Sequence, residues 1–586
     1  MKKLYILGAI LLGIISIAGC SNKEDISKER IIKKSLIAAD EKNKPTTLGE
    51  YDVLFKANSI IPYIKITDGV SIMSDLRKTT YPSLNAYYKA TKENDDLVIK
   101  NENGASCKIN LKNQTFKYDD FDLFSGISNE NQKPLALLTY SKDTKAYKLL
   151  SSEYKAGKPV TVNLNDYSSL DIYDKDGELY IPVTVYNSLL FSLTKGVNFA
   201  YNYKDLYIIA DDQLTVTVIG IKLLTDFGKK YYNESLKMES ISDALVDYNY
   251  QSLCLEFDLN YGLENKFDSL DKYLTNNGYD KDIKSTNPKT IDNGLAIALS
   301  YIGDGHTAFD NFSTFYDNEG GAIDEKKLNP VPVKNEEKQE ELKENKYETR
   351  KVFGKDYKIP IGVEYGEETA IVNFDDFNDI KENILYEEKD DEVRRTSTAA
   401  IFADLYSGLK KAENSKIKNV VVDLTTNGGG SSDALIYSAS ILVGEVTVNI
   451  VDPLTGALNV QKYKADMNLD GSVDDKDVSL VDKGYNVYIL SSAYSFSSAN
   501  ALPALATLNS DKVITLGAKT AGGPCAICSY YTGIGSSLYH SSLTTISKLK
   551  DGKYVNIDDG VEAKYTLTEA QMIDREYLLT NISKWV

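Results

Sequence analysis

The stretch YILSSAYSFSSANALPALATLNSDKVITLGAKTAGG, Tyr488–Gly523, decides the fold of the C-terminal part of this chain. Apolar residues at 487–490 predict a strand, a serine-dense turn follows, and small residues at about 497–508 predict a helix. A second apolar run at 513–516 predicts another strand, which ends in a glycine turn. This strand–helix–strand order predicts an α/β core.

Ser497 stands at the turn between the first strand and the helix. A serine in that place has an exposed hydroxyl, and the helix N-terminus beside it supplies free backbone N–H donors and a positive dipole end. Such a setting suits a nucleophile whose product is an oxyanion. Ser497 is therefore a candidate nucleophile, and a simple helix cap is the alternative.

Two upstream segments carry matching chemistry. In VVVDLTTNGGGSSDALIYSASIL, a β-branched run at 420–424 predicts a strand buried on both faces, and Asn427–Gly430 turn the chain into a helix. Backbone N–H groups in such a turn can face a developing negative charge. His306, in YIGDGHTAF, follows a predicted helix and has an ordinary pKa near neutrality, so it is a candidate general base. The other histidine, His540, has no motif around it, which favours a structural role.

DGHT, the NGGG turn and the FSSA–helix–strand–GxxTxGG segment, in this order, resemble the S41 serine peptidases, the C-terminal-processing and tricorn-core group. The resemblance spans roughly residues 285–310 and 360–575. It implies a ClpP/crotonase-like α/β core, with Ser497 as nucleophile and His306 as general base. It also implies an oxyanion hole from the amide of Gly428 or Gly429 with that of Ser498.

The chain departs from the family pattern at several positions. Ile557 stands where an orienting acid is expected, and the nearest acids are Asp558 and Asp559. The position of the processing enzymes' lysine holds Gly523, and Lys519 is a weak substitute, so the histidine-dependent branch is indicated. That branch has a serine beside its histidine, where this chain has Gly305.

Two functions follow from this pattern. The first is a serine endopeptidase that cleaves exposed or unfolded peptide segments. The alternative is a catalytically impaired S41-fold surface lipoprotein that serves as a peptide-binding or adhesive module, which the departures favour.

The N-terminus resembles a bacterial lipoprotein signal. Lys2 and Lys3 precede an apolar run that is too short to span a membrane and ends in small residues before Cys20. This pattern predicts a signal peptide at 1–20, lipid on Cys20, a polar tether at 21–44, and a location on the outside of a bacterial membrane. An ordinary secretory signal is the alternative.

The composition argues against one class of partner. The net charge is −18 and the pI about 4.9, so no basic surface is expected to offset nucleic-acid phosphates.

Four cysteines remain beyond Cys20: Cys107, Cys254, Cys525 and Cys528. A single CxxC pair makes zinc improbable, and a local disulfide or free thiols at Cys525 and Cys528 stay open.

The chain is long enough for several domains. Residues 45–215 are expected to form a β-rich domain, weakly similar to the domain beside copper amine oxidases, without a copper site. Residues 216–310 are expected to be helical and to end in DGHT, 311–350 to be a linker, and 351–586 to be the peptidase core. The highly charged stretch at 317–346 is compatible with a linker or with an exposed helix. The linker is too short for the PDZ domain that many processing peptidases carry.

One insertion, at 464–478, matches a twelve-residue calcium loop. Oxygen side chains stand at its positions 1, 3 and 5, glycine at 6 and an acid at 12. The predicted ligands are Asp466, Asn468, Asp470, Asp477 and the carbonyl of Ser472. The aspartate at position 12 resembles dockerin-type loops, but only one loop is present, so a structural calcium ion is expected rather than a docking module. An acidic turn is the alternative.

Overall fold

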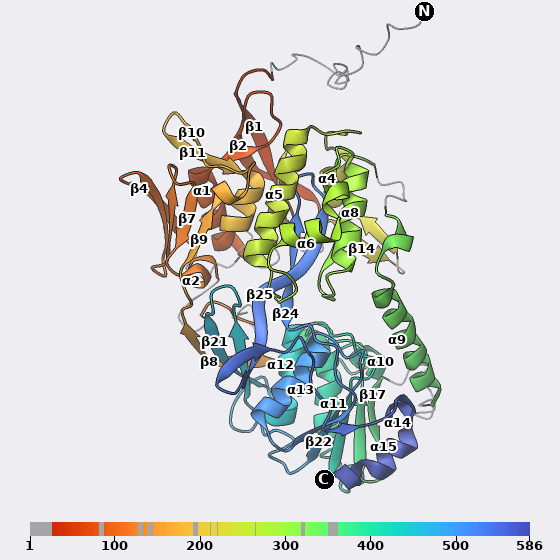
Figure 1. Ribbon diagram of the computed structural model, residues 1–586. Coiled ribbons are helices and arrows are strands. Elements are labelled where there is room, and N and C mark those ends of the chain that lie inside the picture. The colour runs from red at the N-terminus through yellow and green to blue at the C-terminus, as the bar shows by residue number, and fades with distance from the viewer. Residues whose placement is uncertain are drawn as a thin grey trace, which may run out of the picture.

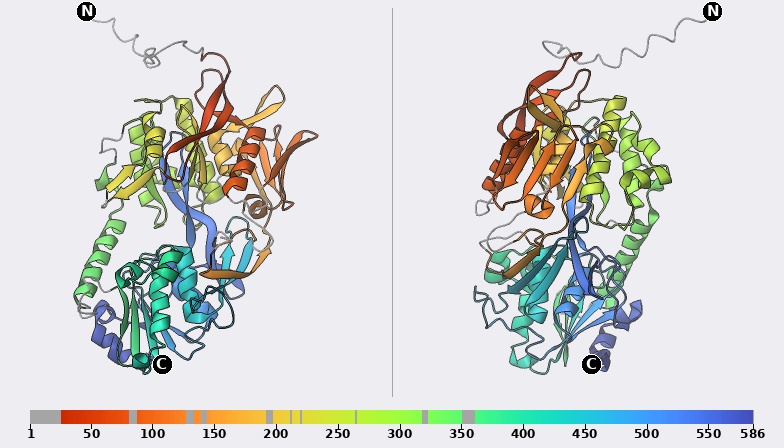
Figure 2. Two further views of the ribbon diagram at one scale, coloured as in Figure 1. Left: turned by 180° about the vertical axis from the view of Figure 1, so that it is seen from behind. Right: turned by 60° about the vertical axis from the view of Figure 1, so that its left-hand side comes forward.

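The computed structural model describes residues 26–80, 87–126, 133–138, 144–191, 197–210, 213–218, 221–263, 265–317, 323–349 and 361–585. The chain forms two bodies stacked on one another (Figure 1). The upper body holds most of the N-terminal half, and the lower body is an α/β core. Helix α9 (Pro330–Thr349) and the long strands β24 (Cys525–Tyr531) and β25 (Ser537–Lys550) run between them (Figure 2).

The lower body is built on a six-stranded sheet in the order β17-β18-β19-β22-β23-β27. All its strands are parallel to their neighbours except β17 at one edge. Their bounds are β17 Gly362–Tyr365, β18 Thr369–Asn373, β19 Asn419–Asp423, β22 Asn486–Ser491, β23 Val513–Gly517 and β27 Tyr565–Thr566. The strands predicted at 420–424, 487–490 and 513–516 are thus confirmed as β19, β22 and β23.

Alternate side chains of the central strands bury opposite faces of this sheet. Val420 and Val422 pack in the cluster that contains helices α11 (Thr398–Gly408), α12 (Ser432–Val443) and α13 (Ser498–Asn509). Val421 and Tyr488 pack on the other face, with α14 (Glu569–Ile573) and α15 (Arg575–Asn581). The β-branched run at 420–422 is therefore buried on both faces, as expected for a parallel sheet.

A second sheet ties the lower body to the rest of the chain. Its order is β16-β25-β20-β21-β8, with β24 and β26 also paired to β25. The bounds are β8 Tyr147–Lys155, β16 Ala308–Asn311, β20 Val446–Val451, β21 Leu458–Ala465 and β26 Lys553–Asn556. Strand β25 pairs near its start with β16 and further along with β20. The segment after DGHT is thereby fixed against the core.

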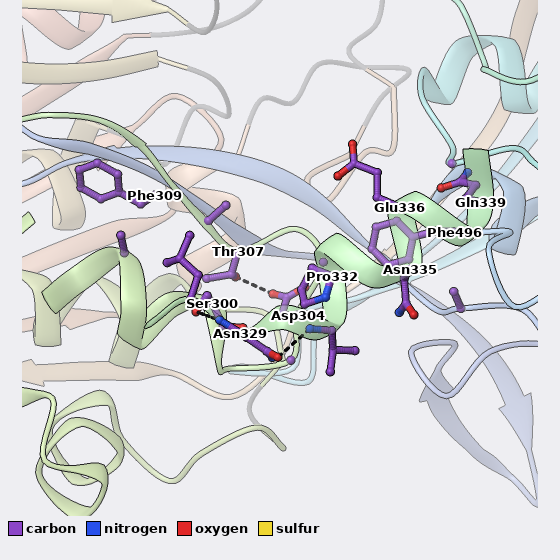
Figure 3. Close-up of a pocket in the computed structure, with 18 of the residues that line it drawn as sticks. Ser300, Asp304, Thr307, Phe309, Asn329, Pro332, Asn335, Glu336, Gln339 and Phe496 are labelled. Atoms are coloured by element: carbon purple, nitrogen blue, oxygen red, sulfur yellow. Dashed lines mark hydrogen bonds between the residues drawn. The ribbon is translucent and has the colours of Figure 1, made fainter. Parts of the chain in front are cut away.

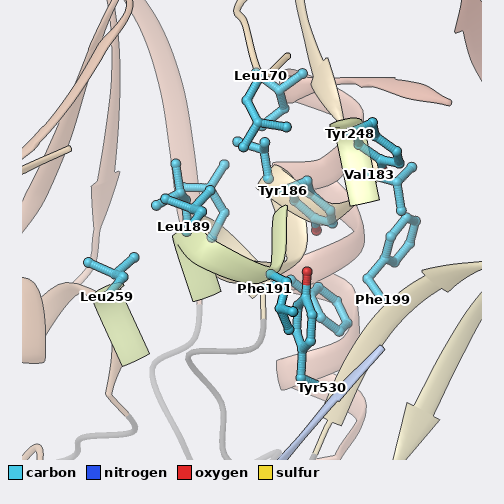
Figure 4. Close-up of a cluster of buried hydrophobic side chains, with 14 of the residues drawn as sticks. Leu170, Val183, Tyr186, Leu189, Phe191, Phe199, Tyr248, Leu259 and Tyr530 are labelled. Carbon is cyan, nitrogen blue, oxygen red and sulfur yellow. The ribbon is translucent and has the colours of Figure 1, made fainter. Parts of the chain in front are cut away.

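The upper body combines two antiparallel-rich sheets with a helical layer. The first sheet runs β10-β11-β3-β2-β1-β13-β12 and the second β4-β5-β6-β7-β9. The helices that follow are α4 Asp226–Asn233, α5 Asp243–Asn260, α6 Leu270–Asn277, α7 Asp280–Ile283 and α8 Pro288–Ser300. Tyr530 of β24 inserts among their side chains in the largest apolar cluster, so the C-terminal strands complete this core (Figure 4).

The remaining elements of this region are short. The strands of the two sheets are β1 Arg30–Ala39, β2 Pro45–Phe55, β3 Tyr63–Lys65, β4 Tyr88–Glu93, β5 Asp96–Asn101, β6 Ser106–Asn110, β7 Thr115–Tyr118, β9 Val160–Asn163, β10 Tyr173–Lys175, β11 Glu178–Pro182, β12 Val197–Tyr201 and β13 Leu206–Ala210. A separate hairpin consists of β14 Thr215–Val218 and β15 Ile221–Leu224, and the helices are α1 Ile66–Thr80, α2 Phe121–Ser125 and α3 Val183–Tyr186. Helix α10 Asp391–Arg394 belongs to the lower body (Figure 1).

Three predicted boundaries differ from the structure. The tether predicted at 21–44 is wrong from Arg30 onward, because β1 pairs with β2 along its length and buries Leu36 and Ile37. Strand β8, predicted within the 45–215 domain, pairs with β21 of the core. The predicted 311–350 linker contains α9, which is anchored to the core. Residues 1–25, including Cys20, lie outside the described residues.

Candidate active site

Ser497 lies where β22 turns into α13. Its backbone has φ 54° and ψ −120°, a region that non-glycine residues seldom adopt, and its amide donates to the carbonyl of Gly522 at 2.9 Å. Although Ser497 occupies the N-cap position, its hydroxyl caps no backbone amide. A strained residue with an uncommitted hydroxyl is characteristic of functional turns.

The glycine turn approaches Ser497 closely. An added Cβ at Gly429, whose φ is +109°, would come within 2.6 Å of Ser497 Cβ. The amide of Gly429 donates to Asn427 Oδ1 at 2.9 Å. In the described part of the chain, the amides of Gly428 and Ser498 donate to no acceptor. Of the predicted oxyanion donors, Gly428 and Ser498 are thus the two that remain available.

His306 lies in the turn between α8 and β16. Its amide donates to Asp304 Oδ1 (3.0 Å), and Asp304 Oδ2 accepts hydrogen bonds from Thr307 (2.6 Å) and Tyr261 (3.1 Å). His306 is 5% exposed, and its Nδ1 is buried with no hydrogen-bond partner among the described residues. Burial lowers the pKa of His306, against the opposing charges of Asp304 and Asp558. The imidazole is therefore neutral at neutral pH and able to accept a proton.

The Phe496 ring lies between the DGHT turn and the turn that carries Ser497. Its centroid lies 4.7 Å from that of the His306 ring, and it precedes Ser497 directly. No hydrogen bond between Ser497 and His306 is present in the described structure. An added Cβ would come within 2.6 Å of the ring at Gly305 and likewise at Gly523. Phe496 thus fills the space that the family's serine and lysine side chains would need.

Lys519 is turned away from this site. It is half exposed and pairs with Glu562 at 3.1 Å, which gives it no role as a base for Ser497.

Asp558 lies closer to the site than Asp559. Its carboxylate pairs with Lys266 Nζ at 3.0 Å, and Lys266 also donates to the carbonyl of Gly303 at 3.0 Å. Lys266 therefore ties the loop of Asp558 to the turn that carries His306. Asp559 is exposed. Sequence reasoning missed Lys266, because it lies in no motif and reaches both loops only through the tertiary fold.

A groove of about 980 Å³ runs beside these segments (Figure 3). Gly305 and Thr307, which flank His306, line it together with Gly428 and Phe496. Its other walls are the first half of α9 and the residues of β16. The groove therefore lies next to the predicted site: the chain neighbours of His306 and Ser497 line it, together with Gly428, one of the predicted oxyanion donors.

Helix α9 is fastened to the core by a buried lysine that sequence reasoning also missed. Lys346 is 0% exposed, and its Nζ donates to Asn373 Oδ1 (2.8 Å) and Thr426 Oγ1 (2.5 Å). It also lies 3.5 Å from Asp375 Oδ1. Gln339 lies two turns before Lys346 on the same side of α9, and its side-chain amide donates to the carbonyl of Thr426 at 3.0 Å. These contacts hold α9 directly behind the glycine turn.

The predicted calcium loop follows β21. Asp466 is fully buried: its Oδ2 accepts hydrogen bonds from Tyr386 and the amide of Gly471, while Oδ1 has no partner. Both oxygens of Asp477 accept backbone amides.

The remaining loop oxygens are held in local turns. Asn468 accepts from the amide of Asp470, and Asp470 accepts from that of Ser472. Within the described residues, no three His, Cys, Asp or Glu side chains are grouped to hold a metal. Of the predicted carboxylate ligands Asp466, Asp470 and Asp477, only Asp466 has an oxygen without a hydrogen-bond partner among the described residues.

The other predicted residues lie apart from the chemistry. His540 is fully buried, with Nε2 3.2 Å from Glu256 Oε1, and this places it in the core of the upper body. Among the described residues, Cys107, Cys254, Cys525 and Cys528 form no disulfide. In the described part of the chain, no helix is both long and apolar enough to cross a membrane.

Residues 369–562 match the family model of Peptidase family S41. No curated protein matches the chain. The match excludes His306 and the upper body, and it supports a protease-type function for the core.

Solved structures of related type show a limited likeness. A protein from Parabacteroides merdae ATCC 43184 described as a peptidase is 17% identical, with a TM-score of 0.38 over 58% of this chain and 96% of that one. A lipoprotein from Streptococcus agalactiae is 15% identical, with a TM-score of 0.34 over 58% and 95%. Mature CPAF complexed with lactacystin is 10% identical, with a TM-score of 0.35 over 58% and 98%.

Proposed function

We propose that the protein is a serine endopeptidase of S41 type that is anchored by lipid on Cys20 to the outside of a bacterial membrane and cleaves exposed or unfolded peptide segments. The observation that supports the proposal is the contact of the Phe496 ring, next to Ser497 in the chain, with the His306 ring at 4.7 Å, beside a groove that Gly428 also lines. The lipid anchor rests on the sequence pattern before Cys20 alone.

In this mechanism Ser497 Oγ attacks the carbonyl carbon of the scissile peptide bond, and His306 accepts the hydroxyl proton. The amides of Gly428 and Ser498 donate to the oxyanion that forms. His306 then gives the proton to the leaving amine. Catalytic hydrogen bonds are often long in ligand-free enzymes and tighten in the complex, which suits the uncommitted Ser497 hydroxyl.

A second candidate function is peptide binding without hydrolysis. It is favoured by the buried Nδ1 of His306, which no acid orients, because a triad base normally has such a partner.

Labelling with a fluorophosphonate probe separates the two functions. A peptidase should be labelled and should cleave an unfolded protein, and Ser497→Ala should lose both. Ser510→Ala, at the other end of α13, is the matched control and should keep both. If wild type is neither labelled nor active, the binding function is the correct one.

A further inference from the structure

The groove beside Ser497 has acidic and aromatic walls. Among the described residues that line it, none is Lys or Arg. Its acidic lining residues are Asp304, Asp310, Glu325 and Glu336, and its aromatic ones are Phe309, Phe312, Tyr494 and Phe496. A ligand in the groove therefore meets negative charge and apolar rings together.

Helix α9 turns one face toward the groove. Its lining residues are Val331, Pro332, Asn335, Glu336 and Gln339, which share one side of a helix with 3.6 residues per turn. Figure 3 shows Asn335, Glu336 and Gln339 near Phe496, with Phe309 toward the other end of the groove. Lys334 and Lys338, on the same helix, do not line it.

Two of the four acids are available to a ligand. Asp304 is buried and holds the His306 turn, and Asp310 accepts hydrogen bonds from Asn311 and Ser537. Glu325 and Glu336 are exposed, and their carboxylates have no ion pair or hydrogen bond to other described residues. Each can therefore pair with a cation that enters the groove.

We propose that this groove binds extended peptide segments in which Lys or Arg alternate with apolar or aromatic residues. The proposal deepens the peptidase function and rests on it. Glu325 and Glu336 would pair with the cationic side chains, while Phe309, Phe312 and Phe496 would pack against the apolar ones and the lysine or arginine stems. Two partly screened ion pairs should favour a basic peptide over an acidic one on the order of tenfold at physiological salt.

The test measures binding separately from hydrolysis. Three fluorescein-labelled, unstructured peptides are used that differ only in carrying Lys, Gln or Glu at alternate positions between Phe and Ala. Their affinities for the full chain with Ser497→Ala are measured by fluorescence anisotropy. The same is done after adding Glu325→Lys with Glu336→Lys. The matched control adds Glu337→Lys with Glu344→Lys, which changes the net charge equally but does not alter the lining.

The expected order of affinity is Lys, then Gln, then Glu. The preference should shrink at high salt, should be lost or reversed in the groove variant, and should persist in the control. Equal affinities, no binding of any peptide, or a preference unchanged in the groove variant would overturn the proposal. Cleavage of the bound Lys peptide by wild type tests the peptidase function independently, because binding can succeed where hydrolysis fails.

Discussion

At the residue scale, the backbone of Ser497 makes a prediction that separates strain from chemistry. A non-glycine residue at φ 54°, ψ −120° carries backbone strain of about 1–3 kcal/mol. Ser497→Ala and Ser497→Gly both remove the hydroxyl, but only glycine adopts this conformation freely. We expect both variants to be inactive and the glycine variant to be more stable, by about 1 kcal/mol after its extra unfolded-state entropy is subtracted. Equal midpoints in urea unfolding would mean that Ser497 is unstrained.

His306 makes a prediction about pH. Burial lowers its pKa below the ordinary histidine value, so the base is neutral and active at a lower pH than a solvent-exposed histidine would be. The value of kcat/KM should therefore rise on the acidic side and reach its plateau at a lower pH than with a solvent-exposed histidine as the base. Measuring kcat/KM of the wild type between pH 5 and 9 checks this. A rise that continues to pH 8–9 would indicate a lysine base instead.

At the element scale, α9 is expected to depend on one buried charge. Lys346→Met leaves Asp375 without its closest buried cation and removes two hydrogen bonds, and breaking such a buried pair costs about 3–5 kcal/mol. Lys343→Met removes a partly exposed lysine on the same helix that lies 3.7 Å from Asp375, and it should cost about 1 kcal/mol or less. Urea unfolding of the two variants compares them directly. Similar losses would mean that α9 is held by its apolar contacts rather than by Lys346.

The calcium loop is tested by removing metal. Asp466 is buried with one unused oxygen, and burial raises its pKa, so an ion that Asp466 helps to bind would relieve an unfavourable carboxylate. Calcium that binds only the folded state raises the melting temperature by mass action. We expect wild type to melt lower in chelator than in millimolar calcium, and Asp466→Asn with Asp470→Asn to show no difference. Identical melting of wild type in both conditions would leave the loop as an acidic turn.

The sequence predicts individual strands and helices better than it predicts which of them pack together. The strands and helix around Ser497 and the glycine turn follow from apolar runs and turn residues within a few positions, and β19, β22, β23 and α13 form accordingly. Charged residues cover most of the surface of α9, so the sequence is compatible with either a linker or an exposed helix there, and nothing local marks Lys346 as buried. Strand β1 was missed for a similar reason, since its lysines hide the alternation around Leu36.

At the scale of the whole molecule, the site depends on contacts between segments far apart in the chain. The DGHT turn reaches Phe496 because β16 pairs with β25, and Lys266 then links that turn to Asp558. No spacing within a motif encodes these pairings. The sequence could therefore nominate His306 and Ser497, but it could not show that Phe496 lies against His306 or that Gly305 and Gly523 make room for its ring.

The junction of the two bodies contains a buried pair of carboxyl groups. Asp122 of α2 lies beside Asp452, which follows β20, and the Thr455 hydroxyl donates to Asp122 Oδ2 at 2.8 Å. Burial raises the pKa of both groups, and that of Asp452 to about 6, while Asp120 and the phenol of Tyr154 lie nearby. The folded pair therefore holds a proton more readily than two free aspartates would.

This pair predicts a loss of stability as the pH rises. Because the folded pKa values exceed the ordinary aspartate value, the folded state binds more protons than the unfolded state, so the stabilisation present at low pH is lost as pH rises through the folded pKa values. Asp452→Asn keeps a hydrogen-bonding side chain but removes one of the two charges. We expect the variant to match wild type near pH 4–5 and to exceed it at pH 8 by roughly 1–3 kcal/mol. Asp511→Asn, in an exposed turn, is the control, and urea unfolding at several pH values is the measurement. A constant difference between Asp452→Asn and wild type across this range would mean that the carboxyl pair does not link the junction of the two bodies to pH.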